Sequence, residues 1–296
     1  MKKITPSPTA SRRATLLALP ALFGTAAFGL AQQAAAQVPE PVFGTPGKDS
    51  GWIPTPAGMV EAMLEMAGIT AADIVVDLGS GDGRIPILAA KRYGARGLGI
   101  EYNPDLVKYS ISVAEREGLA DRVKFIHGDI FVTDFSHATV VTLFMPPAFN
   151  LKVRPQLLAM KPGTRVVSFN FDMGDWPPDQ SVYVNDQRGM LWRVPTSVAG
   201  LWRLNFTDAG ANRDTPPHVL RVGQRFQQIE GDITIASERL ALWDIRFEVD
   251  RLRFTVLRNI AGRLQRVDFD CRRVGATLEG IMQASGEPAR RWTAAL

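Results

Sequence analysis

The stretch VVDLGSGDGRIPI at residues 75–87 constrains the fold more than any other part of this sequence. A short apolar strand runs into glycines at alternating positions, and the chain then becomes apolar again with helical spacing. Glycines at a strand end let the backbone turn tightly and approach a ligand closely. The stretch therefore predicts a strand–turn–helix unit that binds a ligand at the turn.

The segments around this turn alternate between strand and helix patterns. An amphipathic helix is expected over residues 57–69, and the domain that begins there is expected to reach residue 211. Strands are expected at 73–78, 96–101, 122–129, 138–144 and 164–171, with helices at 83–94, 103–118 and 147–160. This alternation predicts a Rossmann-like, mainly parallel sheet with helices on both faces.

The pattern changes at both ends of this domain. Residues 37–56 are rich in Pro and Gly and predict an extended lead-in. Residues 212–296 show short segments with partial alternation, which predict a small C-terminal antiparallel β-domain, either a meander or a partial barrel. Two similar pieces, MLWRVP at 190–195 and GLWRLN at 200–205, could form a hairpin.

Residues 1–36 have the features of an export signal. Arg12 and Arg13 precede an apolar run at 16–30, and small residues at 34–36 suit a signal peptidase. The run is short for a bilayer span, and the paired arginines favour the twin-arginine route. We expect a periplasmic protein with no stable membrane span after cleavage. The alternatives are a cytoplasmic protein or an anchored one whose N-terminal segment stays uncleaved.

Charge and composition argue against a nucleic-acid partner, a metal site and an internal disulfide. The formal net charge is +4, from 34 basic and 30 acidic residues, but four of the basic residues lie within the first 36, where no acid occurs. The remainder is close to neutral, so no nucleic-acid footprint is visible. The three histidines are far apart and Cys271 is the single cysteine, so we expect neither a metal site nor an internal disulfide.

The glycine turn does not match the common nucleotide motifs. A dinucleotide fingerprint needs a third glycine where Arg84 stands, and no Lys-Ser/Thr pair follows for a P-loop. The pattern Asp77-x-Gly79-x-Gly81-x-Gly83 instead resembles the first motif of class I S-adenosylmethionine-dependent methyltransferases. Glu101 ends the next strand, where an acid can accept hydrogen bonds from both ribose hydroxyls of an adenosyl group.

A longer resemblance extends this interpretation. The segments 52–56, 75–110 and 164–179 resemble bacterial relatives of the mitochondrial lysine methyltransferases that modify the ATP synthase c-subunit. This resemblance implies that S-adenosylmethionine is the methyl donor, with Asp129 accepting from the adenine amino group and Ile130 packing on the ring. The predicted cofactor-binding residues are Asp77, Gly79, Ser80, Gly81, Gly83, Glu101, Tyr102, Asp129 and Ile130.

The acceptor side of the site is less clearly marked. LFMPPAF at 143–149 resembles the Asn/Asp-Pro-Pro-aromatic motif of amine-modifying methyltransferases, but Met145 replaces the polar residue and Ala148 the aromatic one. Methylation of a nucleic-acid base is therefore less expected. The predicted catalytic residues are Trp52, Asn170 and Asp172. The predicted substrate-binding residues are Pro54, Thr55, Met145, Pro146, Phe171 and Trp176.

The adenosyl signals favour a methyltransferase, and the resemblance implies that it acts on nitrogen, with a protein lysine as one candidate acceptor. Such a lysine must first lose its proton, and an apolar pocket favours this by lowering the pKa of the amine. Two alternatives remain from the sequence. One is a non-catalytic exported protein that binds an adenosyl group or serves as a scaffold. The other is a small-molecule methyltransferase whose substrate is guided by the β-domain.

Overall fold

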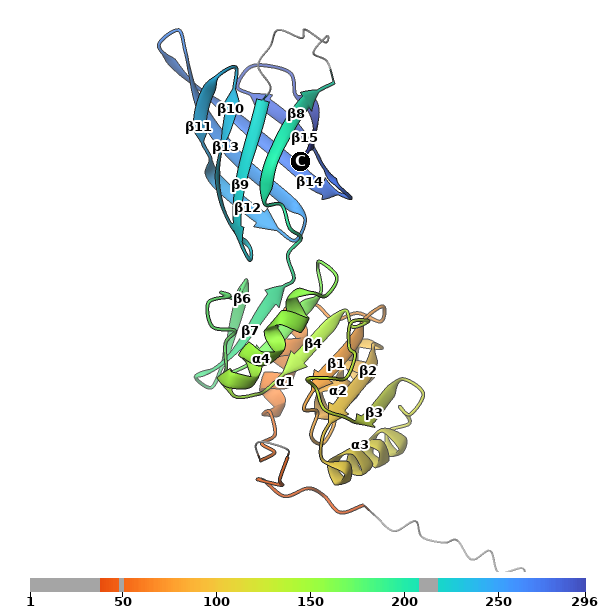
Figure 1. The fold of residues 1–296 in the computed structure, drawn as a ribbon. Coiled ribbons are helices and arrows are strands. Elements are labelled where there is room, and N and C mark those ends of the chain that lie inside the picture. The colour runs from red at the N-terminus through yellow and green to blue at the C-terminus, as the bar shows by residue number, and fades with distance from the viewer. Residues whose placement is uncertain (1–37, 48–50, 208–217) are drawn as a thin grey trace, which may run out of the picture. The chain divides into compact units, whose positions relative to one another are not determined.

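The computed structural model describes residues 38–47, 51–207 and 218–296. The predicted export signal at 1–36 lies outside these described residues. The described chain forms a seven-stranded sheet followed by a nine-stranded sheet (Figure 1). In this part of the chain, no helix is long and apolar enough to cross a membrane.

The first sheet has the strand order β3-β2-β1-β4-β5-β7-β6. Five strands are parallel, and the antiparallel pair β7 and β6 extends the sheet beyond β5. The bounds are β1 Ile74–Leu78, β2 Arg96–Glu101, β3 Val123–His127, β4 Val140–Leu143, β5 Arg165–Phe169, β6 Gln180–Val184 and β7 Gln187–Arg193. Because β1 lies between β2 and β4, the strand order reverses beside the glycine turn, where open α/β sheets bind ligands.

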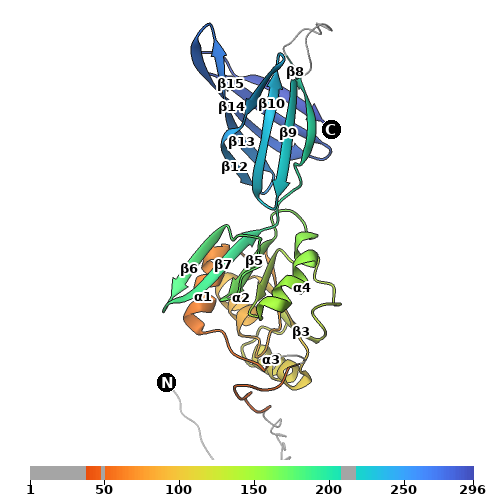
Figure 2. The ribbon, with the colours of Figure 1, turned by 60° about the vertical axis from the view of Figure 1, so that its left-hand side comes forward.

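Helices cover both faces of this sheet, as predicted (Figure 2). They are α1 Ala57–Ala67, α2 Arg84–Tyr93, α3 Pro104–Arg116 and α4 Pro147–Leu158. Successive strand residues point to opposite faces. Val75 therefore packs with α1 and α2, whereas Val76 packs in the cluster that contains residues of α4. The helix α4 passes through Pro155 without ending there.

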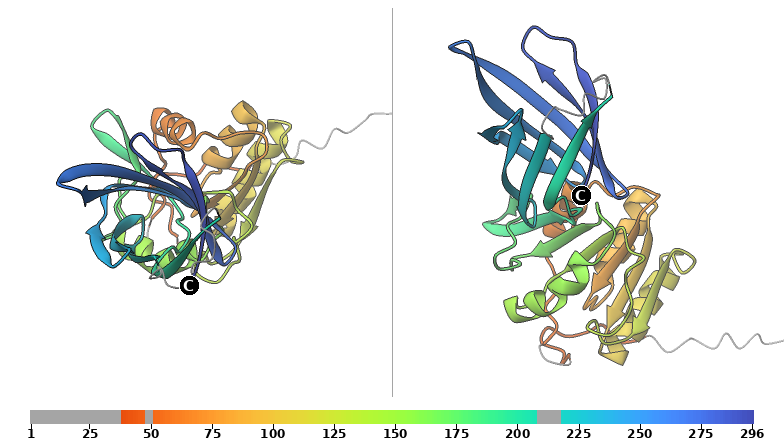
Figure 3. Two further views of the ribbon diagram at one scale, coloured as in Figure 1. Left: turned by 90° about the horizontal axis from the view of Figure 1, so that it is seen from above. Right: turned by 45° about the horizontal axis from the view of Figure 1, so that its top comes forward.

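The second sheet is antiparallel throughout, with the order β11-β10-β9-β8-β16-β15-β14-β13-β12. The bounds are β8 Gly200–Phe206, β9 His218–Arg225, β10 Gln228–Ile235, β11 Glu238–Ala241, β12 Trp243–Glu248, β13 Arg251–Ile260, β14 Arg263–Val274, β15 Thr277–Ala284 and β16 Arg290–Ala295. The sheet curls, so that β10 contacts β12 and β11 contacts β13 (Figure 3). The predicted C-terminal antiparallel β-domain is confirmed.

The passage from one sheet to the other differs from the expectation. Strand β8 pairs with β9 and β16, so the chain enters the second sheet well before residue 212. The predicted hairpin of the two LWR segments is wrong, since β7 pairs with β5 and β6 in the first sheet. Met190, Leu191 and Trp192 are consecutive and all buried, which suits an interior strand, whereas β8 alternates between buried and exposed residues.

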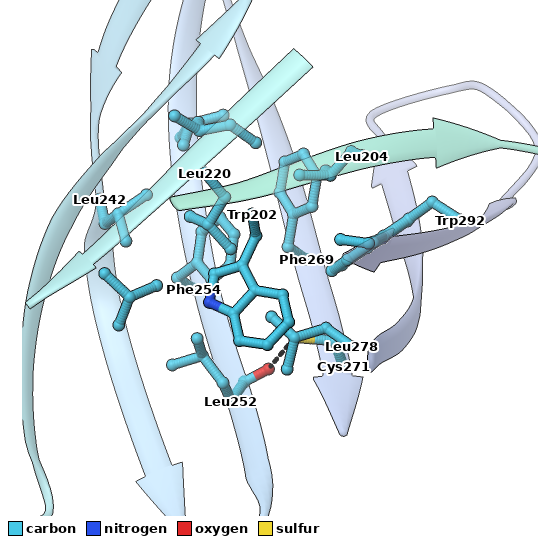
Figure 4. Close-up of a cluster of buried hydrophobic side chains, with 14 of the residues drawn as sticks. Trp202, Leu204, Leu220, Leu242, Leu252, Phe254, Phe269, Cys271, Leu278 and Trp292 are labelled. Atoms are coloured by element: carbon cyan, nitrogen blue, oxygen red, sulfur yellow. Dashed lines mark hydrogen bonds between the residues drawn. The ribbon is translucent and has the colours of Figure 1, made fainter. Parts of the chain in front are cut away.

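The second sheet encloses an aromatic core of its own (Figure 4). Phe254 and Phe269 stack with ring centroids 4.8 Å apart, and Trp292 meets Phe269 edge-on. Cys271 is buried among them, and its thiol donates to the carbonyl oxygen of Leu252 at 3.4 Å. Burial raises the pKa of Cys271 to about 12, so the thiol is an inert core group.

Candidate active site

The three glycines of the turn after β1 have different structural roles. All have positive φ, at 75° for Gly79, 53° for Gly81 and 80° for Gly83. A Cβ on Gly81 would lie 2.1 Å from Nε1 of Trp52, and one on Gly83 would lie 2.5 Å from Cζ of Phe125. Gly79 has open space instead and lines the pocket. Gly83 thus makes room for core packing, and Gly79 makes room for a ligand.

Glu101 holds the turn together and still has capacity for a ligand. Its Oε2 accepts from the backbone N–H of Gly81 at 2.9 Å, and its Oε1 accepts from the N–H of Asn103 at 2.9 Å. An ionised carboxylate can accept about four hydrogen bonds, so each oxygen retains a lone pair. Glu101 also lines the pocket, which is the geometry that the predicted ribose contact needs.

The pocket lies beyond the carboxyl ends of β1, β2 and β4 and gathers most of the predicted cofactor residues. The predicted cofactor residues that line it are Gly79, Glu101, Tyr102, Asp129 and Ile130, and Trp52 and Met145, predicted for the acceptor side, line it as well. The sequence analysis missed Gly47, Gly51, Ile53, Leu106, Gly128, Phe131, Phe144 and Phe149. Phe144 and Phe149 flank the Met-Pro-Pro segment, so their position in LFMPPAF was the available signal.

A narrower polar pocket adjoins the first. The two share Trp52, Ile53, Gly79 and Phe144, and the narrow one is further lined by Pro54, Thr55, Asp77, Ser80, Asp82, Arg84 and Ile85. Ser80 Oγ is buried and has no hydrogen-bond partner among the residues that the structure describes. A buried hydroxyl without a partner is rare and suits a ligand group that is yet to be bound.

Asp77 gives the narrow pocket its unusual electrostatics. The carboxyl group is completely buried and accepts from Thr142 Oγ1 at 2.7 Å. Burial raises the pKa of Asp77 to about 7, and the nearby charges of Asp82 and Glu101 add to this, against the hydrogen bond from Thr142. A cation placed beside Asp77 would favour its charged form. With the Ser80 hydroxyl, this environment fits the amino-acid end of S-adenosylmethionine.

The lead-in segment covers the turn. Arg84 donates to the backbone oxygen of Thr55 at 2.8 Å, and Asn103 Nδ2 donates to that of Pro46 at 2.7 Å. These contacts hold residues 44–47 and 51–55 against the sheet and place Trp52 beside Gly81. Trp52, Pro54 and Thr55 therefore lie at the pocket, as predicted.

Phe144 links the pocket to the chain that follows β5. Its ring stacks with Phe171 at a centroid distance of 5.9 Å and contacts Phe169 at 4.5 Å. Asn150, which is fully buried, donates to the carbonyl oxygens of Phe171 and Asp172 at 3.1 Å each. Phe171 thus packs against a residue of the pocket wall without lining the pocket itself.

Several predicted acceptor residues lie elsewhere. Asn170 is exposed in a left-handed conformation, with its N–H bonded to the carbonyl oxygen of Arg188. Asp172 is also exposed, and its Oδ1 accepts from the N–H of Gly174 at 3.0 Å. Pro146 is exposed at the start of α4. None of the three lines either pocket described above.

Trp176 requires a correction. It is 0% exposed, stacks on Phe226 with centroids 5.8 Å apart, and donates from Nε1 to Gln227 Oε1 at 3.0 Å. A side chain buried in this way cannot contact a substrate, so its predicted role in substrate binding is wrong.

Across the described ranges, no group of three or more His, Cys, Asp or Glu side chains could hold a metal ion.

Comparison with known proteins agrees with this site. The family model described as the ANTKMT methyltransferase domain matches residues 77–180. A protein-lysine N-methyltransferase of Saccharolobus islandicus (strain REY15A) is 40% identical over 137 residues, which cover 46% of this chain and 85% of that relative. The chain belongs to this class I methyltransferase family. This enzyme therefore uses S-adenosylmethionine as its methyl donor, as predicted.

Other relatives match the same part of the enzyme. The human lysine N-methyltransferase of the ATP synthase c-subunit is 35% identical over 129 residues, or 43% of this chain. This chain covers 54% of that relative, about half of its length. A crystal structure described as an RNA methyltransferase from Salinibacter ruber with S-adenosyl-L-homocysteine is 49% identical, with a TM-score of 0.49. The alignment covers 49% of this chain and 96% of the Salinibacter chain.

Proposed function

We propose that this methyltransferase acts on the ε-amino nitrogen of a lysine in a protein. The observation that carries the proposal is the apolar wall where the two pockets meet. Phe144 and Ile53 line both pockets there, and Met145 and Phe149 continue the wall. Such a wall strips water from an entering ammonium group and lowers the pKa of the amine, which yields the neutral nucleophile.

The aromatic side chains of this wall also attract the lysine as it arrives in its charged form, before it loses its proton. The faces of Trp52 and Phe144 attract an ammonium group, by about 0.5–1 kcal/mol at an exposed site and more when water is excluded. Met145 stands where amine-modifying relatives carry a polar Asn or Asp, so the wall has no side chain there to hold the planar amino group of a base. The names of the curated relatives, which are lysine methyltransferases, support the same acceptor.

The division of labour within the site follows from these contacts. Bound S-adenosylmethionine supplies an electrophilic methyl group on its sulfonium sulfur. In this proposal Glu101 and Asp129 hold the adenosyl part, and Asp77 and Ser80 hold the amino-acid part. Phe144 and the lead-in residue Trp52 then exclude water and orient the amine, and such positioning accounts for most of the catalysis that this displacement needs.

A labelling experiment tests the acceptor. The purified protein is incubated with S-adenosylmethionine labelled in the methyl group. Cell-envelope proteins, total RNA and small-molecule amines are each supplied as the acceptor in a separate reaction. We expect the label in protein, with methyl-lysine identified by mass spectrometry. Label confined to RNA or to small molecules would exclude a protein lysine.

A variant pair ties the result to the wall. Phe144→Leu keeps an apolar side chain but removes the aromatic face, so it should lower kcat/KM for the protein acceptor while S-adenosylhomocysteine still binds. Phe206→Leu, in the second sheet, is the matched control and should leave both quantities unchanged. Equal activity of the two variants would contradict the role given to Phe144.

We also propose that residues 1–36 direct the protein to the periplasm as a twin-arginine signal. The support is the Arg12-Arg13 pair followed by the apolar run at 16–30. Replacing both arginines by lysine should retain the unprocessed protein in the cytoplasm when cells are fractionated. A wild-type protein that keeps residues 1–36 and stays in the membrane fraction would instead identify an uncleaved anchor.

A further inference from the structure

The turn between β13 and β14 exposes apolar side chains within a strongly basic stretch. Leu257, Ile260 and Leu264 are 42%, 45% and 73% exposed. Residues 257–266 contain three arginines and no Asp or Glu. An exposed aliphatic cluster set among cations is unusual for a surface that meets only water. We call residues 257–264 the β13–β14 tip.

The tip extends beyond the strands on either side of it. The pairing of β13 with β14 continues to Ile260 and Arg263, whereas β15 follows β14 only as far as Val267. On the other side, β12 follows β13 only as far as Thr255. The two longest strands of the sheet therefore end as a projecting hairpin, visible in blue in Figure 3.

The cations around the tip differ in how far they are neutralised. Arg258 lies 3.7 Å from Glu238, and Arg266 makes ion pairs with Asp244 and Asp268. Arg263 is exposed and has no ion-pair partner in the described part of the chain. Free positive charge is thus present at the end of the hairpin, next to Leu264.

Both faces of the tip carry an aliphatic side chain. Leu257 and Leu264 lie on one face of the hairpin, and Ile260 and Arg263 lie on the other, as their pairing register requires. A flat protein partner would cover one face of the tip and leave the other exposed to water. A lipid interface surrounds a tip that enters it and would cover both faces. Single-stranded nucleic acid stacks on aromatic side chains, and residues 257–266 contain none.

We propose that the β13–β14 tip docks on the surface of an anionic lipid bilayer. The aliphatic side chains enter the boundary between headgroups and acyl chains, and the arginines remain at the lipid phosphates. Each arginine near such a surface strengthens binding by roughly fivefold, and salt weakens the effect. The proposal concerns where the enzyme resides and does not depend on its methyl acceptor.

Vesicle sedimentation tests the proposal. The protein used is residues 38–296, which form a compact unit without the N-terminal segment. We expect it to sediment with vesicles of phosphatidylglycerol and phosphatidylcholine and to remain in solution with phosphatidylcholine alone. The double variant Ile260→Ser/Leu264→Ser and the single variant Arg263→Glu should each weaken sedimentation, the former by about tenfold or more.

The matched control lies on the same sheet away from the tip. Val274→Ser/Ile281→Ser also removes two exposed aliphatic side chains, 48% and 42% exposed, and should sediment like the wild type. Circular dichroism and S-adenosylhomocysteine binding check that every variant is folded. Equal sedimentation of the tip and control variants would overturn the proposal. Equal binding of the wild type to both vesicle types would also overturn it. So would RNA binding through the tip by a protein that does not bind anionic vesicles.

Discussion

Replacing the buried Asp77 by Asn should stabilise this methyltransferase, and should do so increasingly as the pH rises. The carboxyl group is completely buried at the narrow pocket, where an ionised oxygen is costly. The substitution Asp77→Asn keeps the shape of the side chain and an oxygen that can accept from Thr142 Oγ1, but it removes the titration. The comparison therefore isolates the cost of the charge from the cost of repacking.

The size of the effect follows from the pKa of Asp77. That pKa is raised from 3.8 to about 7 in the folded protein, so the folded state holds the proton more tightly than the unfolded state does. Stability from this group is complete below pH 3.8 and is lost as the pH rises through 7. At about 1.4 kcal/mol per pKa unit, the wild type should lose about 2 kcal/mol relative to Asp77→Asn between pH 5.5 and 8.5.

Urea unfolding of both proteins at several pH values measures this difference. The free-energy gap between Asp77→Asn and wild type should widen with pH up to about 7.5, then level off. The exposed Asp172→Asn is measured beside it as the matched control for an Asp-to-Asn change at the surface. A gap for Asp77→Asn that does not change with pH would refute the reasoning. The same variant should bind S-adenosylhomocysteine more weakly, since the ammonium group of the ligand loses its anionic partner.

Three further results are expected from the site and its surroundings. Glu101→Ala should weaken S-adenosylhomocysteine binding by about tenfold or more in calorimetry, because charge-assisted bonds to the ribose hydroxyls are lost. Gly79→Ala should lower ligand affinity and cost about 1–2 kcal/mol in unfolding free energy, since alanine is strained at a φ of 75°. Gly83→Ala should cost about 1–3 kcal/mol more than Gly79→Ala, since its Cβ also strikes Phe125. Trp176→Ala should cost about 3–5 kcal/mol of stability and leave ligand affinity of the folded fraction unchanged. Reversed effects for the two glycines, or a specific loss of affinity for Trp176→Ala, would contradict these assignments.

The cofactor side of the site was predictable because its determinants are local. Gly79 and Asp129 lie just after a strand and Glu101 ends one, and parallel strands present their carboxyl ends at one edge of the sheet. Once the strands were recognised, these residues had to converge. The pairing of Glu101 with the N–H groups of Gly81 and Asn103 then arises from the same geometry.

The acceptor side was less predictable because its residues are placed by contacts between distant segments. Phe144 lies on the wall between the two pockets, but the comparison with the Asn/Asp-Pro-Pro-aromatic motif pointed to its neighbour Met145 instead. Trp176 follows the same strand as Asn170 and Asp172, and nothing in the local pattern reveals that its ring is buried against Phe226. Side-chain direction after a strand end depends on the packing of the loop, which periodicity does not encode.

The sequence by itself determined the alternating α/β domain, the glycine turn, the two acids that line the pocket at the strand ends and the separate antiparallel β-domain. These features depend on residue spacing within a strand, a helix or a turn, where the backbone geometry leaves few choices. Only the tertiary structure decided which sheet receives each LWR strand, which aromatic side chains face the pocket and which basic residues surround the projecting β13–β14 tip. Those outcomes depend on pairing and burial between segments far apart in the chain, and similar short sequences satisfy them in different ways.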